Sequence, residues 1–308
     1  MLRPAPRLAA RGRSTTAPGR QRQRIPLWFL LPALGVYTIV VLYPTVSGGV
    51  YAFTDWAGTR GDATFTGLAN FRAIASDPDA SAALRNTVLL AVGVTILQTV
   101  IGLALALALH TALATRNVLR TLLFAPAVLP PVIIGFLWQF MLAPTGPVNQ
   151  LLESLGLGTL QQNWLGDSSV ALWSVIGVVV WQNAGLSMVI FLAGLEGVPT
   201  ELLEASAIDG AGWWSRLRRI VLPLLTPALT IVLSLALISS LKVFDQVFVM
   251  TGGGPGYATE TLSLLMYKEA FVSGQFGYSA AVALVLTMLV AALALFQFGV
   301  LRRFEVKS

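Results

Sequence analysis

The feature that most constrains this chain is a set of six apolar stretches that contain no Asp, Glu, Lys or Arg. They cover residues 27–50, 87–109, 121–143, 170–195, 220–241 and 278–301. A bilayer core about 30 Å thick needs about 20 helical residues to cross it, and each stretch is at least that long. Because backbone polar groups cannot stay unpaired in lipid, each stretch must be a helix; barrel strands would be about half as long and would alternate. The sequence therefore predicts an all-α, polytopic membrane protein with six transmembrane helices.

The composition agrees with this class and excludes others. Hydrophobic residues make up 56% of the chain and charged residues only 11%, against roughly 25% charged residues in a typical soluble domain. The same proportions exclude an intrinsically disordered chain. There is no cysteine and only one histidine, His110. We therefore expect no zinc or haem site, and no cofactor bound by this chain.

The basic residues predict an orientation. If the N-terminus is cytoplasmic, the inside segments hold 15 of the 20 lysines and arginines. The positive-inside rule then places both termini in the cytoplasm. Residues 1–26 carry seven arginines and no acid, and we expect them to be a disordered tail, with residues 27–308 forming one six-helix domain. No aromatic residue interleaves with these arginines before Trp28, so the net charge of +6 does not indicate a nucleic-acid partner.

The third apolar stretch differs from the others because it contains Pro126, Pro130 and Pro131. Each proline removes a backbone donor and clashes with the preceding turn, so we expect this helix to kink or unwind. Such a break has two interpretations, a packing kink or a helix that lines a path across the membrane. The second and fifth stretches, in contrast, are predicted to be the plainest lipid-facing helices.

Polar side chains gather toward the predicted outer ends of the third, fourth and fifth stretches. They are Trp138, Gln139, Trp181, Gln182, Asn183, Lys242, Asp245 and Gln246. Lys242 and Asp245 are three residues apart, a spacing that would let them neutralise each other on one helix face. One interpretation is that these residues only mark the outer membrane boundary. The other is that amides and tryptophans surround a solute path, a mixture that suits a sugar better than a bare ion.

Catalytic motifs are missing from the sequence. No Gly-Lys dipeptide exists, so the chain lacks the phosphate-binding loop of ATPases, and it also lacks the G-x-S-x-G and H-E-x-x-H patterns. The glycine-rich residues 251–256 lie in a predicted outside loop with no following lysine. We therefore expect a translocation protein that is not an enzyme and takes its energy from a partner or from an ion gradient.

The inside loop at 199–223 is the most informative segment. Thr200 is a suitable N-cap, Glu201 lies in the first turn of a short helix of small and apolar residues, and Gly210 and Gly212 end it. The pattern alone leaves two alternatives. One is an interfacial amphipathic helix, and the other is a protrusion that a partner grips.

Three motifs give this chain a resemblance to a known family. Glu204-Ala205-Ser206-Ala207-x-Asp209-Gly210, then nine residues, then Ile220-x-Leu222-Pro223, resembles the EAA motif of permease subunits of binding-protein-dependent ABC importers. Ser206 departs from the second alanine but keeps a small side chain. Residues 65–71 and 244–262 are similar to two further elements of the carbohydrate-uptake (MalF-like) branch, F-x-G-L-x-N-F and F-D-x-x-x-x-M-T-x-G-G-P with T-x-T-L.

The resemblance implies a type I importer (MetI-like) fold in a bacterial-type inner membrane, and a division of labour. The implied partners are a second permease, two copies of a cytoplasmic ATPase that hold ATP and Mg²⁺, and an extracytoplasmic solute-binding protein. The loop would form a coupling helix seated on the ATPase. Its coupling residues would be Glu204, Ala205, Ser206, Asp209 and Gly210.

The expected solute is a sugar, with a sugar phosphate or a polyol such as glycerol phosphate as the alternative. Lys242 is the only cation placed to meet an anionic solute at the predicted path. A second alternative is an ion-coupled secondary transporter, although the six stretches contain none of the acids that a proton or sodium relay uses. A membrane scaffold or sensor is the third, but no sizeable soluble domain exists to carry its output.

Overall fold

The computed structural model describes residues 27–58, 63–111 and 115–301, which are helical apart from turns, loops and one isolated bridge between Thr54 and Phe65. The predicted tail at 1–26 and the last residues, 302–308, lie outside the described ranges. The chain separates into two compact units, one ending at Val46 and one beginning at Ser47.

The first unit is helical from Leu27 onward. It contains α1 (Leu31–Tyr37), a π-helical turn (Thr38–Leu42) and the start of α2 (Tyr43–Tyr51). Pro44 has no amide hydrogen for the carbonyl four residues earlier, which accounts for the local widening of the helix. The candidate span runs from Trp28 to Tyr51, and its most apolar window has no buried residue. A helix that is apolar on all sides fits lipid or a partner helix.

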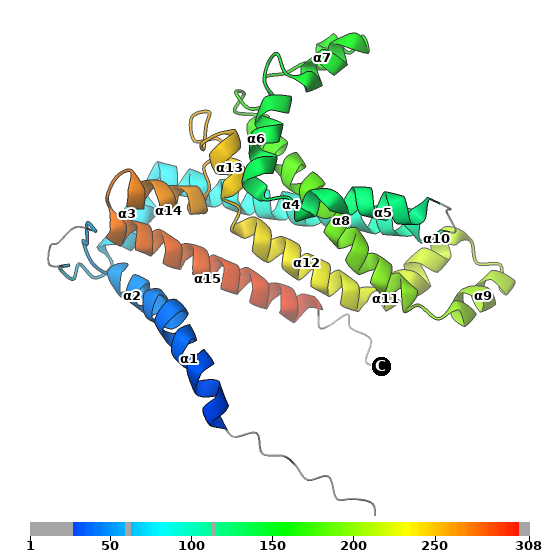
Figure 1. Cartoon of the computed structure of the whole chain (residues 1–308), viewed down its shortest axis with the longest axis horizontal. Helices are drawn as coiled ribbons and strands as arrows, with labels where there is room; N and C mark the ends of the chain where they lie inside the picture. Colours follow the sequence, from blue (N-terminus) through cyan, green and yellow to red (C-terminus); the bar gives the residue numbers. More distant parts are fainter. Residues whose placement is uncertain (1–26, 59–62, 112–114, 302–308) are drawn as a thin grey trace, which may run out of the picture. The chain divides into compact units, whose positions relative to one another are not determined.

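The second unit is built on four long helices that lie alongside one another (Figure 1): α4 (Pro78–Leu109), α8 (Ala171–Glu196), α12 (Thr226–Leu241) and α15 (Phe276–Leu301). Shorter helices connect them, some at the ends of the bundle and some along its side (Figure 1). These are α3 (Ala69–Ser76), α5 (Arg116–Phe124), α6 (Pro131–Met141), α7 (Pro147–Ser154), α9 (Thr200–Ile208), α10 (Trp213–Arg216), α11 (Leu222–Leu224), α13 (Asp245–Met250) and α14 (Leu262–Phe271).

The most extensive helix packing in the bundle is between α4 and α8. A Cβ atom added at Gly102 of α4 would lie 2.5 Å from the Cβ of Ser187 on α8. Beside this contact, Gln98 Nε2 donates a hydrogen bond of 2.9 Å to Ser187 Oγ. In a bilayer, the hydrophobic effect does not drive helices together, because lipid is as apolar as the helix surfaces. Helix association therefore depends on small residues, which let the backbones approach, and on hydrogen bonds between helices. The core continues along α8 through fully buried side chains such as Ile176, Met188 and Phe191.

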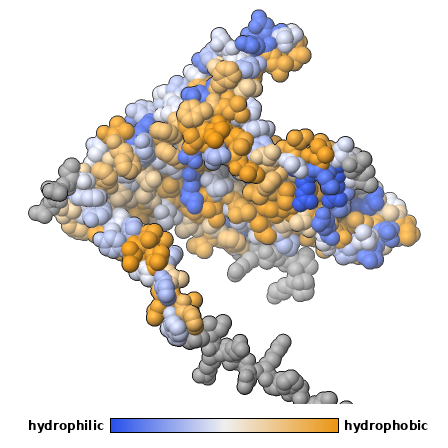
Figure 2. Space-filling model, viewed as in Figure 1, coloured by the Kyte–Doolittle hydropathy of each residue, from blue (hydrophilic) through white to orange (hydrophobic). Residues whose placement is uncertain are grey.

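All six predicted membrane crossings correspond to helices or bent helix pairs. Four are single helices, and two are pairs bent at a break: Arg116–Val128 with Pro131–Met141, bent by 100°, and Trp213–Leu224 with Thr226–Leu241, bent by 71°. The kink predicted for the third stretch is therefore confirmed. Figure 2 shows broad hydrophobic surface over the visible face of the bundle, as a lipid-embedded chain requires.

The prediction of a plain fifth helix is wrong. The chain forms a π-helical turn at Leu217–Val221 and then bends before α12. Pro223 and Pro227 cause this, because neither has an amide hydrogen to continue the helical ladder. The carbonyl of Pro223, which Pro227 cannot bond, instead accepts a hydrogen bond of 2.8 Å from Thr226 Oγ1.

Candidate functional site

The helix of the predicted coupling loop, α9, is almost free of the rest of its own chain. It has no buried residue, and only Leu203 and Ser206, one turn apart, are half-buried. Ile208 is 86% exposed, and Glu204, Ala205 and Asp209 are exposed as well. In Figure 1, α9 projects from the end of the bundle that carries α10 and α11. An exposed apolar tip of this kind is typical of a surface that a protein partner covers.

The end of α9 is a left-handed glycine turn. Gly210 has φ +74°, the Ala211 amide donates to the Ser206 carbonyl at 2.9 Å, and the Gly210 amide donates to the Ala207 carbonyl at 3.1 Å. This pair of bonds is the Schellman motif, which favours glycine at its left-handed position. The predicted glycine stop is confirmed. The predicted cap is not, because the helix begins at Thr200 itself, Pro199 precedes it and no side chain caps it.

A packing contact of α9 attaches this loop to the bundle. Leu203 packs against the buried cluster that joins α4, α8 and the π-helical turn, including Leu195 and Leu217. Nearby, Arg116 forms an ion pair of 3.3 Å with Glu196 at the end of α8. A displacement of α9 therefore acts directly on α8 and on the segment that leads into α12.

The predicted polar set of the membrane region is only partly brought together. Gln246 Nε2 donates to Gln182 Oε1 at 2.9 Å, and Gln182 Nε2 donates to the Leu129 carbonyl at 3.1 Å. Both glutamines are at most 5% exposed. Leu129 lies at the break of the third crossing, so the network joins the third and fourth predicted stretches to α13, which follows the fifth. It also supplies a donor to a carbonyl that the proline-broken helix leaves free.

The other predicted path residues lie around this network. Trp138 and Trp181 form an edge-to-face pair with ring centres 5.3 Å apart. Gln139 is exposed, and Asn183 bonds the carbonyl of Val179 on its own helix at 2.9 Å.

The expected pairing of Lys242 with Asp245 is wrong. Lys242 is the residue after α12 and Asp245 begins α13, so the helical spacing between them is broken. No ion pair joins the two residues.

The glycine-rich outer loop forms a set of contacts with α4 that sequence reasoning missed. Asn86 Nδ2 donates to the carbonyls of Tyr257 at 2.9 Å and Glu260 at 3.1 Å, and the Leu262 amide donates to Thr87 Oγ1 at 2.9 Å. The only sequence signal was the pair of polar residues at the start of the second apolar stretch. These bonds fix the loop against the N-terminal half of α4.

The same loop contains a buried carboxylate, also unpredicted. Glu260 is fully buried and accepts a hydrogen bond of 2.7 Å from Lys268 Nζ. Burial raises the pKa of Glu260, and the lysine opposes that rise. Gly253, at φ +92°, passes directly over this carboxylate, where a Cβ atom would overlap Glu260 Oε2. Across the described ranges, no three His, Asp or Glu residues lie close enough to hold a metal ion.

Comparison with known proteins gives a family match. Residues 98–306 match a family described as "Binding-protein-dependent transport system inner membrane component". This range contains the third to sixth crossings, α9 and the outer loop.

Individual relatives and a solved structure agree with that match. The chain is 33% identical to the probable starch degradation products transport system permease protein AmyD of Thermoanaerobacterium thermosulfurigenes, over 91% of this chain and 94% of AmyD. It is 32% identical to the multiple sugar-binding transport system permease protein MsmF of Streptococcus mutans, over 90% of this chain and 95% of MsmF. A bacterial alginate ABC transporter, solved with an alginate pentasaccharide-bound periplasmic protein, contains a chain with TM-score 0.78 and 21% identity, covering 92% of this chain and 96% of that one. This last similarity is one of fold.

Proposed function

Because this chain belongs to the family of binding-protein-dependent transport system inner membrane components, we propose that it is one of two different permease subunits that together form the path for a sugar. A soluble extracytoplasmic protein delivers the sugar, and a separate ATPase supplies the energy. The sugar, a mono- or oligosaccharide, is inferred from the carbohydrate solutes named for AmyD and MsmF. Family membership sets aside the ion-coupled alternative.

The observation that carries the ATPase part of the proposal is the geometry of α9. It is a short helix without buried residues, closed by a left-handed glycine turn, in a loop between crossings that carries three arginines. Glu204 and Asp209 are exposed and offer charges to a basic cleft. Ala205 and Ser206 are small enough for a partner to approach closely, and Gly210 permits the turn. ATP and Mg²⁺ belong to the partner.

The transmission of work follows from what α9 is attached to. Leu203 is packed against the buried cluster of α8 and the π-helical turn, and three residues separate α9 from α8. A push on α9 therefore acts on both neighbouring crossings rather than on a flexible linker. For ATP binding to drive transport, the two conformations of the bundle must differ in their contacts with the ATPase.

The solute path is assigned to the polar residues around the break of the third crossing. Gln182, Gln246 and the Leu129 carbonyl supply hydrogen-bonding groups, and Trp138 and Trp181 supply apolar faces. Gln139, Asn183, Lys242 and Asp245 complete the set that we assign to the path. Amides with aromatic faces are the combination that recognises sugars, whose rings carry hydroxyls around apolar C–H faces.

The membrane orientation belongs to the same proposal. The chain is a multi-pass protein of the inner membrane family. We place both termini and α9 in the cytoplasm, because 15 of the 20 basic residues then lie inside. The outer loop and α7 then face the binding protein.

The experiment is uptake of radiolabelled sugar by proteoliposomes that contain this chain, its second permease, its ATPase and a candidate binding protein. Uptake that requires ATP and the binding protein supports the proposal. Glu204→Lys is expected to abolish both binding of the ATPase and ATP-driven uptake, whereas Glu153→Lys, a matched charge reversal on α7, leaves binding of the ATPase intact. Uptake by this chain without the ATPase would overturn the proposal. Preference for a sugar phosphate over the sugar would revise only the solute.

A further inference from the structure

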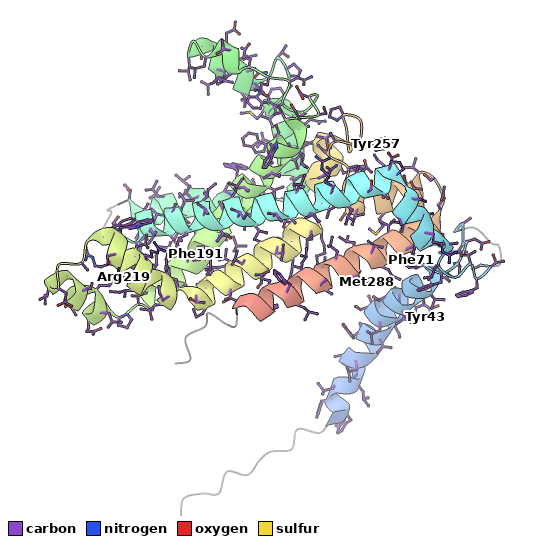
Figure 3. All side chains as sticks on the ribbon, turned by 180° about the vertical axis from the view of Figure 1, so that it is seen from behind. Tyr43, Phe71, Phe191, Arg219, Tyr257 and Met288 are labelled. Carbon is purple, nitrogen blue, oxygen red and sulfur yellow. The ribbon has the colours of Figure 1, made fainter. Side chains whose placement is uncertain are left out.

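The segment that follows α9 carries a cluster that lies outside the five coupling residues assigned to α9 and its turn. Trp213 and Trp214 are 61% and 65% exposed, with their ring centres 5.9 Å apart. Arg218 and Arg219 are exposed one turn later, and the charge-free stretch begins at the next residue, Ile220. Figure 3 labels Arg219 at the end of the bundle near α9, opposite the end that carries Tyr257.

The position of this cluster corresponds to the boundary between lipid and water. Arg218 and Arg219 are the last charged residues before a crossing, which puts their side chains at the depth of the lipid headgroups. Tryptophan favours that depth because its ring is apolar and its N–H is polar. Arginine also extends from such sites to the interface. No acid lies between Asp209 and Asp245 in the sequence, so the positive charge is not neutralised locally.

A cavity lies directly beside the cluster. It has a volume of about 200 Å³, and its lining includes His110, Leu203, Trp213 and Arg216. Arg216 is half-buried, and its Nε is buried without a hydrogen-bond partner. A buried guanidinium N–H without an acceptor is costly, and an oxyanion is its natural partner. The cavity therefore adds a recessed donor to the two exposed arginines.

We propose that Trp213, Trp214, Arg216, Arg218 and Arg219 form a binding site for the phosphate group of an anionic phospholipid of the cytoplasmic leaflet. The phosphate accepts hydrogen bonds from the arginines, and the two indole rings lie at the level of the glycerol backbone. The lipid surface is favoured over the ATPase as the occupant because the cluster borders the apolar stretch, whereas α9 is the part that projects away from the bundle (Figure 1). The inner leaflet of a bacterial membrane supplies such lipids.

The site has a consequence for coupling. The same cavity is lined by Leu203 of α9 and Leu195 of α8. A lipid held there would brace α9 against the bundle, so that anionic lipid and ATPase act on the same element. The inference rests on the proposed cytoplasmic position of this segment, but it does not depend on the identity of the solute.

The test measures lipid binding to the full chain without the ATPase. The purified protein is reconstituted in phosphatidylcholine nanodiscs with increasing fractions of brominated phosphatidylglycerol, and quenching of tryptophan fluorescence reports binding. Arg218→Gln with Arg219→Gln should weaken the phosphatidylglycerol affinity about 25-fold, about fivefold per arginine. Arg218→Lys with Arg219→Lys keeps the charge and should retain most of the binding. The matched control is Arg72→Gln with Arg85→Gln, which removes two exposed arginines from outside segments and should leave the affinity unchanged.

Further arms separate the possible sources of the signal. Excess inorganic phosphate should not displace the lipid, and displacement would show a free-phosphate site instead. Equal quenching by brominated phosphatidylcholine would overturn the proposal. An equal loss of phosphatidylglycerol affinity in the Arg218→Gln, Arg219→Gln variant and in the Arg72→Gln, Arg85→Gln control would also overturn it. If the Arg218→Gln, Arg219→Gln protein binds phosphatidylglycerol normally but loses affinity for the ATPase, the arginines belong to the ATPase interface. A wild-type chain that binds this lipid but no ATPase would instead contradict the proposed function.

Discussion

The turn at Gly210 gives the sharpest test of how α9 works. Its φ of +74° costs an L-residue about 1–2 kcal/mol, whereas asparagine enters this region at lower cost. A Cβ atom at Gly210 would meet nothing of this chain within 4 Å. A substitution therefore changes the backbone preference without creating a clash inside the subunit.

The expected effect on ATPase binding follows from this conformational cost. If the ATPase binds only the closed Schellman turn, Gly210→Ala lowers the fraction of molecules that hold this turn. The affinity for the ATPase should fall by the same factor, about 5- to 30-fold. Gly210→Asn should retain affinity within about twofold, because asparagine tolerates the left-handed region. Gly158→Ala is the control, since Gly158 lies in an outside loop with open space and no positive φ.

The assay titrates the purified ATPase against permease complexes in nanodiscs and measures binding together with stimulated ATP hydrolysis. Equal losses in Gly210→Asn and Gly210→Ala would refute the conformational reasoning and show that the partner needs the space rather than the turn. An unaffected Gly210→Ala would show that the turn is not required.

Three further predictions concern the polar contacts of the bundle. Gln246→Leu leaves the buried side-chain oxygen of Gln182 without its donor and should destabilise the chain by about 1 kcal/mol. Adding Gln182→Leu to the same chain should recover part of this loss. If the two substitutions lower the stability additively in thermal unfolding, the pairing is contradicted. Lys268→Met removes the cation that opposes the raised pKa of Glu260, so that pKa rises further. In this variant, protonated Glu260 stabilises the fold at low pH, and this stabilisation is lost as the pH rises through the folded pKa. Relative to the wild type, the free energy of unfolding of the variant should fall by roughly 2–3 kcal/mol at about pH 8 and by much less at about pH 5. A decrease that is independent of pH would contradict this prediction. Asn86→Ala removes two hydrogen bonds to the outer loop and should speed amide exchange in residues 257–262, with a cost of about 1–3 kcal/mol, while exchange in α9 stays unchanged.

The outer loop illustrates why some contacts escaped sequence reasoning. Glu260 and Lys268 are eight residues apart, separated by a cap and the first turns of α14, and both read as ordinary charges of an outside segment. Only the packing of the loop against α4 buries the carboxylate completely. Burial depends on residues more than 170 positions away, such as Asn86, and no local pattern encodes that distance.

The polar residues of the crossings were found by sequence, but their partners were not. An amide in or beside an apolar stretch stands out because lipid offers it no hydrogen bond, so Gln182, inside the fourth stretch, and Gln246, just beyond the fifth, were identifiable as a set. Whether they bond to each other, to Leu129 or to their own helix, as Asn183 does, depends on how the helices rotate and approach. The failed pairing of Lys242 with Asp245 has the same origin, because the chain changes direction between them.

The sequence by itself indicated the six apolar stretches, the kink of the third one and the glycine end of α9. These follow from local physics: lipid forbids unpaired backbone groups, proline lacks a donor, and a left-handed turn favours glycine. The tertiary structure alone decided the 71° bend of the fifth crossing, the network at Gln182 and the cavity beside Arg216. Each of these depends on which side chains of different helices meet, and that is a property of the packed bundle rather than of any segment.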